Sequence, residues 1–186
     1  VPMLNRHIRA LSERLVQGAL LTHNMLSWAK QHVEWSLAEG DYTARDGVLM
    51  LVIDVNGNAA MTVGEYEPLA DTSAKALRAR SAEARSEADE TGVAPELLAA
   101  VNNGELAFVA PADECLCGTA TLIEQLAQTK GIPVTRVDIP AQLKGALFLV
   151  SDEHGVVPAT ETDAAEADAA TVAFFADGYE KLRARR

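Results

Sequence analysis

The stretch from residue 104 to residue 158 constrains the fold of this chain most, because strand and helix patterns alternate along it. Residues 105–111 are short and apolar and end at a proline, which predicts a strand. Residues 122–130 carry apolar side chains at helical spacing and stop at Gly131, a typical helix-ending residue. Residues 132–139 alternate like a second strand. The pattern predicts a mixed sheet with helices packed on it.

The segment that opens this helix has the composition of an anion seat. It consists of Gly118, Thr119, Ala120 and Thr121. The first backbone N–H groups of a helix lack partners within it, and the helix dipole makes this end positive. With two threonine hydroxyls beside them, these N–H groups could hold a phosphate. The alternative interpretation is an ordinary helix N-terminus with Thr119 as its cap.

The N-terminal part predicts two helices and a hairpin. Apolar residues recur at helical spacing from Ile8 to Ala19, and again from Met25 to Leu37. Residues 48–55 form a strongly apolar strand pattern, Asn56 and Gly57 give a turn signal, and 59–66 is the expected partner strand. We therefore expect a small N-terminal α/β region over residues 1–70.

The remainder, residues 71–186, is expected to form a larger C-terminal domain. A mostly polar helix is predicted over 74–91, capped by residues 71–73 and ended by Gly92. An amphipathic helix is predicted for the tail, 164–186. Together with the sheet pattern, these elements predict an α+β fold.

Composition excludes several kinds of partner and site. The formal net charge is -11, and no basic stripe is present, so nucleic acids and anionic membrane surfaces are disfavoured as partners. No signal-peptide pattern is visible and no apolar run approaches the roughly 20 residues of a membrane helix, so we expect a cytoplasmic protein. Cys115 and Cys117 could supply at most half of a zinc shell, and we expect no metal site.

Taken in order, these segments resemble the fold-type IV (class IV) pyridoxal-phosphate enzymes, which include branched-chain and D-amino-acid aminotransferases and aminodeoxychorismate lyase. The resemblance covers most of the chain and implies the α+β fold of that class, with a small N-terminal helix and hairpin layer and a larger mixed-sheet domain. It also implies a homodimer. The matching pieces are 103–106 (Asn-Gly-Glu-Leu), 115–121 (Cys-Leu-Cys-Gly-Thr-Ala-Thr), 131–134 (Gly-Ile-Pro-Val), 146–151 (Ala-Leu-Phe-Leu-Val-Ser) and 155–159 (Gly-Val-Val-Pro-Ala), with 2–11 and 66–69 upstream.

The resemblance also implies a site for pyridoxal phosphate. Of the five lysines, Lys75 follows residues 66–69 in the expected order and would be the Schiff-base anchor and proton shuttle. The 118–121 segment and Ser151 would seat the phosphate, and His154 would contact the substrate, an amino acid or amino-chorismate. The reaction would be a transamination or a lyase reaction. The alternative interpretations are a surface lysine for Lys75 and a solvated hairpin tip for His154.

Two departures from the family favour a second hypothesis. The family has a phosphate-binding arginine three residues after the histidine of its first helix, but Ala10 holds that position after His7. The family's glutamate segment, which pairs with the pyridine nitrogen, has no counterpart; between Gly92 and Asn103 the chain is shorter by roughly 20 residues, about two strands. The second hypothesis is a non-catalytic, cofactor-free relative that acts as a binding or scaffold protein; segments absent from this sequence would account for the same departures.

Overall fold

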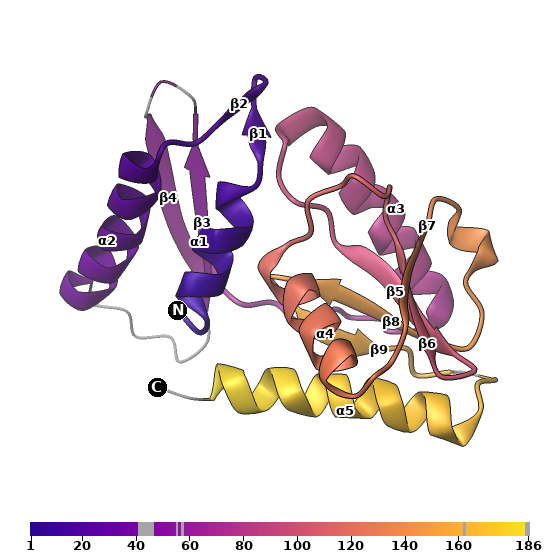
Figure 1. Cartoon of the computed structure of the whole chain (residues 1–186). Coiled ribbons are helices and arrows are strands. Elements are labelled where there is room, and N and C mark those ends of the chain that lie inside the picture. Colours follow the sequence, from indigo (N-terminus) through magenta and orange to yellow (C-terminus); the bar gives the residue numbers. More distant parts are fainter. Residues whose placement is uncertain (41–46, 55, 57, 162, 185–186) are drawn as a thin grey trace. The chain divides into compact units, whose positions relative to one another are not determined.

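The chain forms two compact units, Met3–Pro68 and Leu69–Arg186, called here the small and the large unit. The computed structural model describes residues 1–40, 47–54, 56, 58–161 and 163–184 (Figure 1). Within these ranges, no helix combines the length and the apolar character needed to cross a membrane.

The small unit begins with a helix that is shorter than the sequence predicts. Helix α1 covers Leu4–Ser12, and the prediction of a helix up to Ala19 is wrong beyond Ser12. A small hairpin of β1 (Leu15–Val16) and β2 (Ala19–Leu20) follows instead. Its two turn residues, Gln17 and Gly18, have φ angles of 51° and 80°. Two successive left-handed residues favour a tight hairpin turn and interrupt a helix.

The rest of the small unit follows the predicted order. Helix α2 covers His23–Glu39, and Thr22 caps it by accepting a 3.3 Å hydrogen bond from the Met25 N–H. Strands β3 (Gly47–Ile53) and β4 (Ala59–Glu65) pair antiparallel, as expected for the hairpin. The Asp54 carboxylate accepts hydrogen bonds from the N–H groups of Asn56 and Asn58. The predicted Asn56-Gly57 turn falls partly on residue 57, which lies outside the described residues.

The large unit is built on a five-stranded mixed sheet with the order β7-β6-β5-β8-β9. Strands β6 and β7 are parallel, and the other neighbours are antiparallel. A short 3-10 helix, η1 (Pro140–Gln142), precedes β8. The remaining bounds are α3 (Ala74–Thr91), β5 (Leu97–Asn102), β6 (Glu105–Val109), α4 (Gly118–Thr129), β7 (Val134–Val137), β8 (Ala146–Ser151), β9 (Gly155–Pro158) and α5 (Glu166–Arg183).

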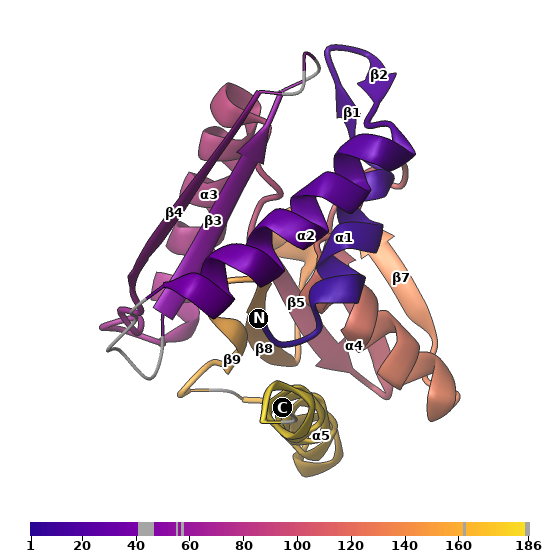
Figure 2. The ribbon, with the colours of Figure 1, turned by 90° about the vertical axis from the view of Figure 1, so that its left-hand side faces the viewer.

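Helices cover both faces of this sheet because its central strands are apolar on both sides. Successive side chains of a strand point to opposite faces. On β5, Leu97, Ala99 and Val101 pack in a core with residues of α4 and α5, whereas Leu98 and Ala100 pack in a second core with Leu77 of α3. Figure 2 views α5 nearly end-on, where it contacts β5, β8 and β9. Helices α3 and α4 therefore lie on opposite faces of the sheet.

A buried carboxylate fastens α5 to the sheet. Asp168, in the first turn of α5, is only 4% exposed. It accepts hydrogen bonds of 2.9 Å from both the Asn103 and the Gly104 N–H groups, in the turn between β5 and β6. Since hydrogen bonds to an ionised group are stronger than neutral ones, this contact fixes the start of α5 against the edge of its core.

Candidate functional site

The predicted anion seat at the start of α4 is already occupied by a side chain of the protein. The Asp152 carboxylate, at the tip of the β8–β9 hairpin, accepts a 3.2 Å hydrogen bond from the Gly118 N–H and a 2.7 Å bond from the Thr119 N–H. Cys117 is the N-cap, and its Sγ accepts a hydrogen bond from the Ala120 N–H at 3.4 Å. The alternative interpretation of Thr119 as the cap is therefore wrong, and the first three amides of α4 all have internal partners.

The hydroxyl groups around this turn also form hydrogen bonds within the protein, with one exception among the described residues. Thr121 Oγ1 donates to the Gly118 carbonyl at 2.7 Å, and the buried Ser151 Oγ accepts from the His154 N–H at 2.8 Å. Within the described part of the chain, the fully buried Thr119 Oγ1 has no hydrogen-bond partner. Ser151 therefore stabilises the β8–β9 hairpin. The Thr119 hydroxyl lies beside the N–H groups that donate to Asp152.

Lys75 lies away from this turn. It is exposed in the first turn of α3, where Asp71 accepts a hydrogen bond from the Ser73 N–H. The start of α3 is joined to the chain beyond the Pro158 end of β9, because the Thr160 N–H donates to the Thr72 carbonyl at 3.0 Å.

The length of β9 indicates how far the start of α3, which carries Lys75, lies from the start of α4. Asp152 precedes the Gly155 end of this strand, and a four-residue strand spans roughly 10 Å. Helices α3 and α4 also cover opposite faces of the sheet. Lys75 and the 118–121 segment therefore lie near opposite ends of β9.

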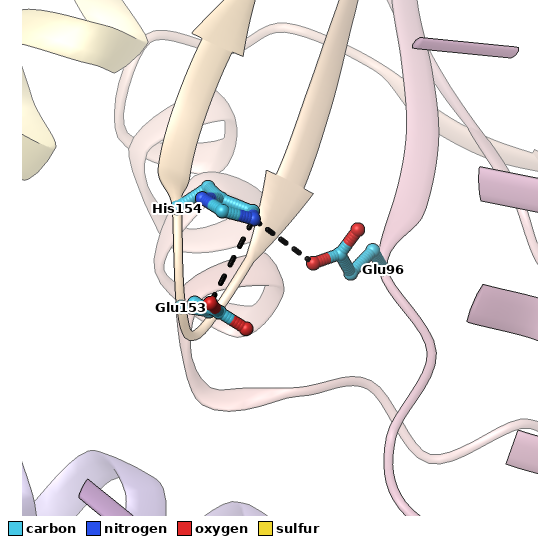
Figure 3. A group of neighbouring side chains, drawn as sticks. All are labelled: Glu96, Glu153 and His154. Atoms are coloured by element: carbon cyan, nitrogen blue, oxygen red, sulfur yellow. Dashed lines mark ion pairs between the residues drawn. The ribbon is translucent and has the colours of Figure 1, made fainter. Parts of the chain in front are cut away.

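The side chain of His154 is buried beside two glutamates (Figure 3). Its side chain is 6% exposed, and its Nε2 lies 3.6 Å from Glu96 Oε1 and 4.0 Å from Glu153 Oε1. Glu96 Oε2 accepts a 2.6 Å hydrogen bond from Arg80 Nε, and this bond raises the pKa of Arg80. The predicted substrate residue thus faces a carboxylate that precedes β5. The sequence shows the adjacent Glu153 and His154, but Glu96 is distant along the chain, so pattern reasoning missed it.

The two cysteines differ in environment. Cys117 is 4% exposed, and Cys115 is half-buried. Burial, and secondly the negative charge of Asp152, raise the pKa of the Cys117 thiol well above its usual range. Because the thiolate is the reactive form, Cys117 is protected both by burial and by protonation.

We expect a thiol reagent to modify Cys115 in the folded protein and Cys117 only after unfolding, since the Cys117 thiolate is disfavoured and covered. Time-resolved labelling with and without denaturant, followed by mass spectrometry, measures this difference. A Cys117→Ser variant is the control and should lose only the modification that requires unfolding. Labelling of Cys117 in the folded protein at the rate of Cys115 would contradict the described burial.

Comparison with solved structures identifies the fold. A proposed branched-chain aminotransferase from Thermotoga maritima superposes with a TM-score of 0.58 at 14% identity, over 98% of this chain and 79% of that one. A branched-chain aminotransferase from Thermobaculum terrenum, in its PLP form, gives 0.55 at 17% identity, over 100% and 80%. A hypothetical aminotransferase from Mycobacterium tuberculosis, with α-ketoglutarate and PMP bound, gives 0.53 at 14% identity, over 98% and 85%. This chain has the class IV aminotransferase fold.

The class IV aminotransferase fold confirms the α+β architecture expected from the sequence, with a helix and hairpin layer and a mixed-sheet unit. No model of a known protein family matches the sequence, and no curated protein matches it either. The structures that share the fold include aminotransferases in complex with pyridoxal or pyridoxamine phosphate. At these identities the likeness concerns the fold, so the fit of the cofactor depends on the residues of this chain.

In the described conformation, the phosphate seat predicted at the start of α4 is engaged by a carboxylate of the protein itself. The two amides that a phosphate would use at the start of α4 donate instead to Asp152. The Ser151 hydroxyl is bound within its own hairpin, and Lys75 lies at the other end of β9. The class IV aminotransferase fold is present, and in it the predicted phosphate seat at the start of α4 holds the Asp152 carboxylate of the protein itself.

Proposed function

We propose that this chain is a cofactor-free relative of the class IV aminotransferases that acts as a binding or scaffold protein. The observation that carries this proposal is the Asp152 carboxylate at the start of α4. It accepts hydrogen bonds from Gly118 and Thr119, the two residues whose N–H groups would otherwise face a phosphate. In this conformation a carboxylate of the protein itself balances the helix dipole and accepts from its first two N–H groups, so no external anion is needed there.

Electrostatics adds a second reason. A unit of negative charge placed about 4 Å from the Asp152 carboxylate costs about 4 kcal/mol at an effective dielectric constant of about 20. A phosphate group carries between one and two such charges near neutral pH. A bound phosphate would therefore require Asp152 to leave the helix, with loss of its two hydrogen bonds.

The second candidate is a pyridoxal-phosphate-dependent aminotransferase or lyase acting on an amino acid or a chorismate-derived substrate. The fold supports it, because solved structures in complex with this cofactor superpose on nearly the whole chain. In this candidate Lys75 anchors the cofactor and moves the proton, and Gly118, Thr119, Ala120, Thr121 and Ser151 hold the phosphate. It requires the β8–β9 hairpin to withdraw Asp152 from the start of α4.

We expect an Asp152→Ser variant to bind inorganic phosphate at least about tenfold more tightly than the wild type, because the competing carboxylate is removed and a hydroxyl donor is added. The measurement is a phosphate titration followed by the backbone amide resonances of Gly118 and Thr119. An Asp113→Ser variant is the matched control, since Asp113 is an exposed aspartate preceding the same helix. It should behave like the wild type.

Pyridoxal phosphate itself separates the two candidates. We expect the wild-type protein to remain colourless with this cofactor and to carry no pyridoxyl label on Lys75 after borohydride reduction. A stoichiometric label on Lys75 would overturn the cofactor-free proposal and support the enzyme. Equal phosphate titrations of the wild type and the Asp152→Ser variant would remove the argument from Asp152, whatever the outcome with pyridoxal phosphate.

A further inference from the structure

A second group of side chains has the chemistry of a metal site and does not depend on the proposed function. Glu96, Glu153 and His154 each offer one ligand atom, and the three atoms lie within 4.8 Å of one another. Figure 3 shows both carboxylates directed at the same imidazole nitrogen, Nε2. Glu96 precedes β5, and the other two residues lie in the β8–β9 hairpin, so the tertiary fold creates this group.

The spacing of the group is close to that of a bound zinc shell. Ligands about 2.0–2.1 Å from a tetrahedral Zn²⁺ lie about 3.3 Å from one another. The distances from His154 Nε2 are 3.6 Å to Glu96 and 4.0 Å to Glu153. The three ligand atoms lie within 4.8 Å of one another, and Glu153 is 44% exposed, so a change of its side-chain rotamer can bring its carboxylate the remaining distance of about 1 Å.

Two of the ligands are already held in place. Glu96 binds Arg80 through Oε2, which leaves Oε1 directed at the imidazole. The backbone N–H of His154 donates to Ser151 Oγ, which fixes the hairpin that carries the histidine. Metal ligands in proteins are commonly oriented by such outer hydrogen bonds, so the site is preorganised before a metal arrives.

The local charge also favours a cation. Arg80 is the positive group here, and it contacts the carboxylates of Glu83, Glu87 and Glu96. With Glu153, two carboxylates face His154 Nε2, against one positive charge on Arg80. A negative, partly buried region that contains an imidazole attracts divalent cations.

We propose that His154 Nε2, Glu96 Oε1 and Glu153 Oε1 bind one divalent transition-metal ion of the Zn²⁺ class, with solvent at the open position beside Glu153. One imidazole and two carboxylates are a zinc donor set, whereas an all-oxygen set would suit Mg²⁺ or Ca²⁺. The alternative is a plain ion pair between a protonated His154 and Glu96. The two alternatives differ in a measurable way, because a metal-bound imidazole must be unprotonated.

The test is a titration of chelator-treated, dialysed protein with zinc chloride, followed by calorimetry and by the imidazole resonances of His154. We expect one site, and a shift of the His154 resonances that saturates with it. A Glu153→Gln variant, altered at an exposed side chain, should bind zinc at least about tenfold more weakly. A Glu105→Gln variant is the matched control, since Glu105 is exposed at the other end of the sheet, and it should match the wild type.

Three results would overturn the proposal. They are the absence of zinc binding to the wild type, equal binding by the wild type and the Glu153→Gln variant, and binding that leaves the His154 ring resonances unmoved. The last result would place the metal elsewhere, for example at Cys115. A His154→Asn variant, tested in parallel, should lose the same site as Glu153→Gln.

Discussion

Replacing Gly145 by alanine is expected to destabilise the large unit by about 3 kcal/mol or more. Gly145 has a φ of +91°, which disfavours any residue with a side chain. A Cβ at this position would also lie 2.2 Å from the Val101 carbonyl oxygen, a backbone atom of the central strand β5. Neither the new Cβ nor the Val101 carbonyl oxygen can rotate away, because both are fixed by the backbone. The start of β8 must therefore separate from β5. Urea unfolding followed by circular dichroism measures the loss.

Gly131 provides the matched control for this substitution. Its φ is +69°, but a Cβ there would have no atom within 4 Å. A Gly131→Ala variant should therefore lose only the cost of the left-handed backbone, about 1–2 kcal/mol. Equal losses for the two variants would show that the approach of Gly145 to β5 does not matter, and would contradict the described pairing of β5 with β8.

Replacing Phe148 by alanine is expected to lower the free energy of unfolding by about 4 kcal/mol. Phe148 lies on β8, is fully buried, and contacts the Phe175 ring of α5 at a centroid distance of 6.1 Å. The substitution leaves a cavity between the sheet and α5 that rigid strands cannot fill. Because a domain of this size is stable by only about 5–15 kcal/mol, the same urea titration should show a large shift of the midpoint.

Phe174 is the control for the aromatic contribution. It is the chain neighbour of Phe175 but half-buried, and Lys130 Nζ lies 4.0 Å from its ring centroid. A Phe174→Ala variant should lose partial burial and one exposed cation–π contact, about 1–2 kcal/mol in total. If Phe174→Ala lowered the free energy of unfolding as much as Phe148→Ala, Phe174 would have to be more deeply buried against the sheet than the structure describes.

The sequence predicts those parts of the fold that depend on neighbouring residues. Helix α3 covers the predicted residues 74–91, because Ser73 accepts a hydrogen bond from the Ala76 N–H and Gly92 adopts a φ of 72°. The β3–β4 hairpin likewise follows from a strongly apolar strand pattern and a turn signal. The tight hairpin at Gln17 and Gly18 was missed because the apolar spacing on both sides of it also fits a helix.

The candidate site was harder to predict because its decisive contacts join distant segments. The Gly118–Thr121 segment predicts an anion seat, and only the fold shows that the Asp152 carboxylate accepts hydrogen bonds there. Similarly, Glu96 and His154 meet only because β5 pairs with β8. Local sequence patterns identify one partner of each contact, such as the N–H groups at the start of α4 or the imidazole of His154. The tertiary fold decides which carboxylate lies beside that partner.

The Asp168 carboxylate has a consequence for measuring the dynamics of the large unit. The N–H groups of Asn103 and Gly104 lie in an exposed turn, where amide protons ordinarily exchange rapidly with solvent. Here both are bound to a buried carboxylate of α5. Their exchange with deuterium should therefore slow to the rate at which α5 leaves the sheet. These two amides make the detachment of the last helix visible at single-residue resolution, without any label on the helix itself.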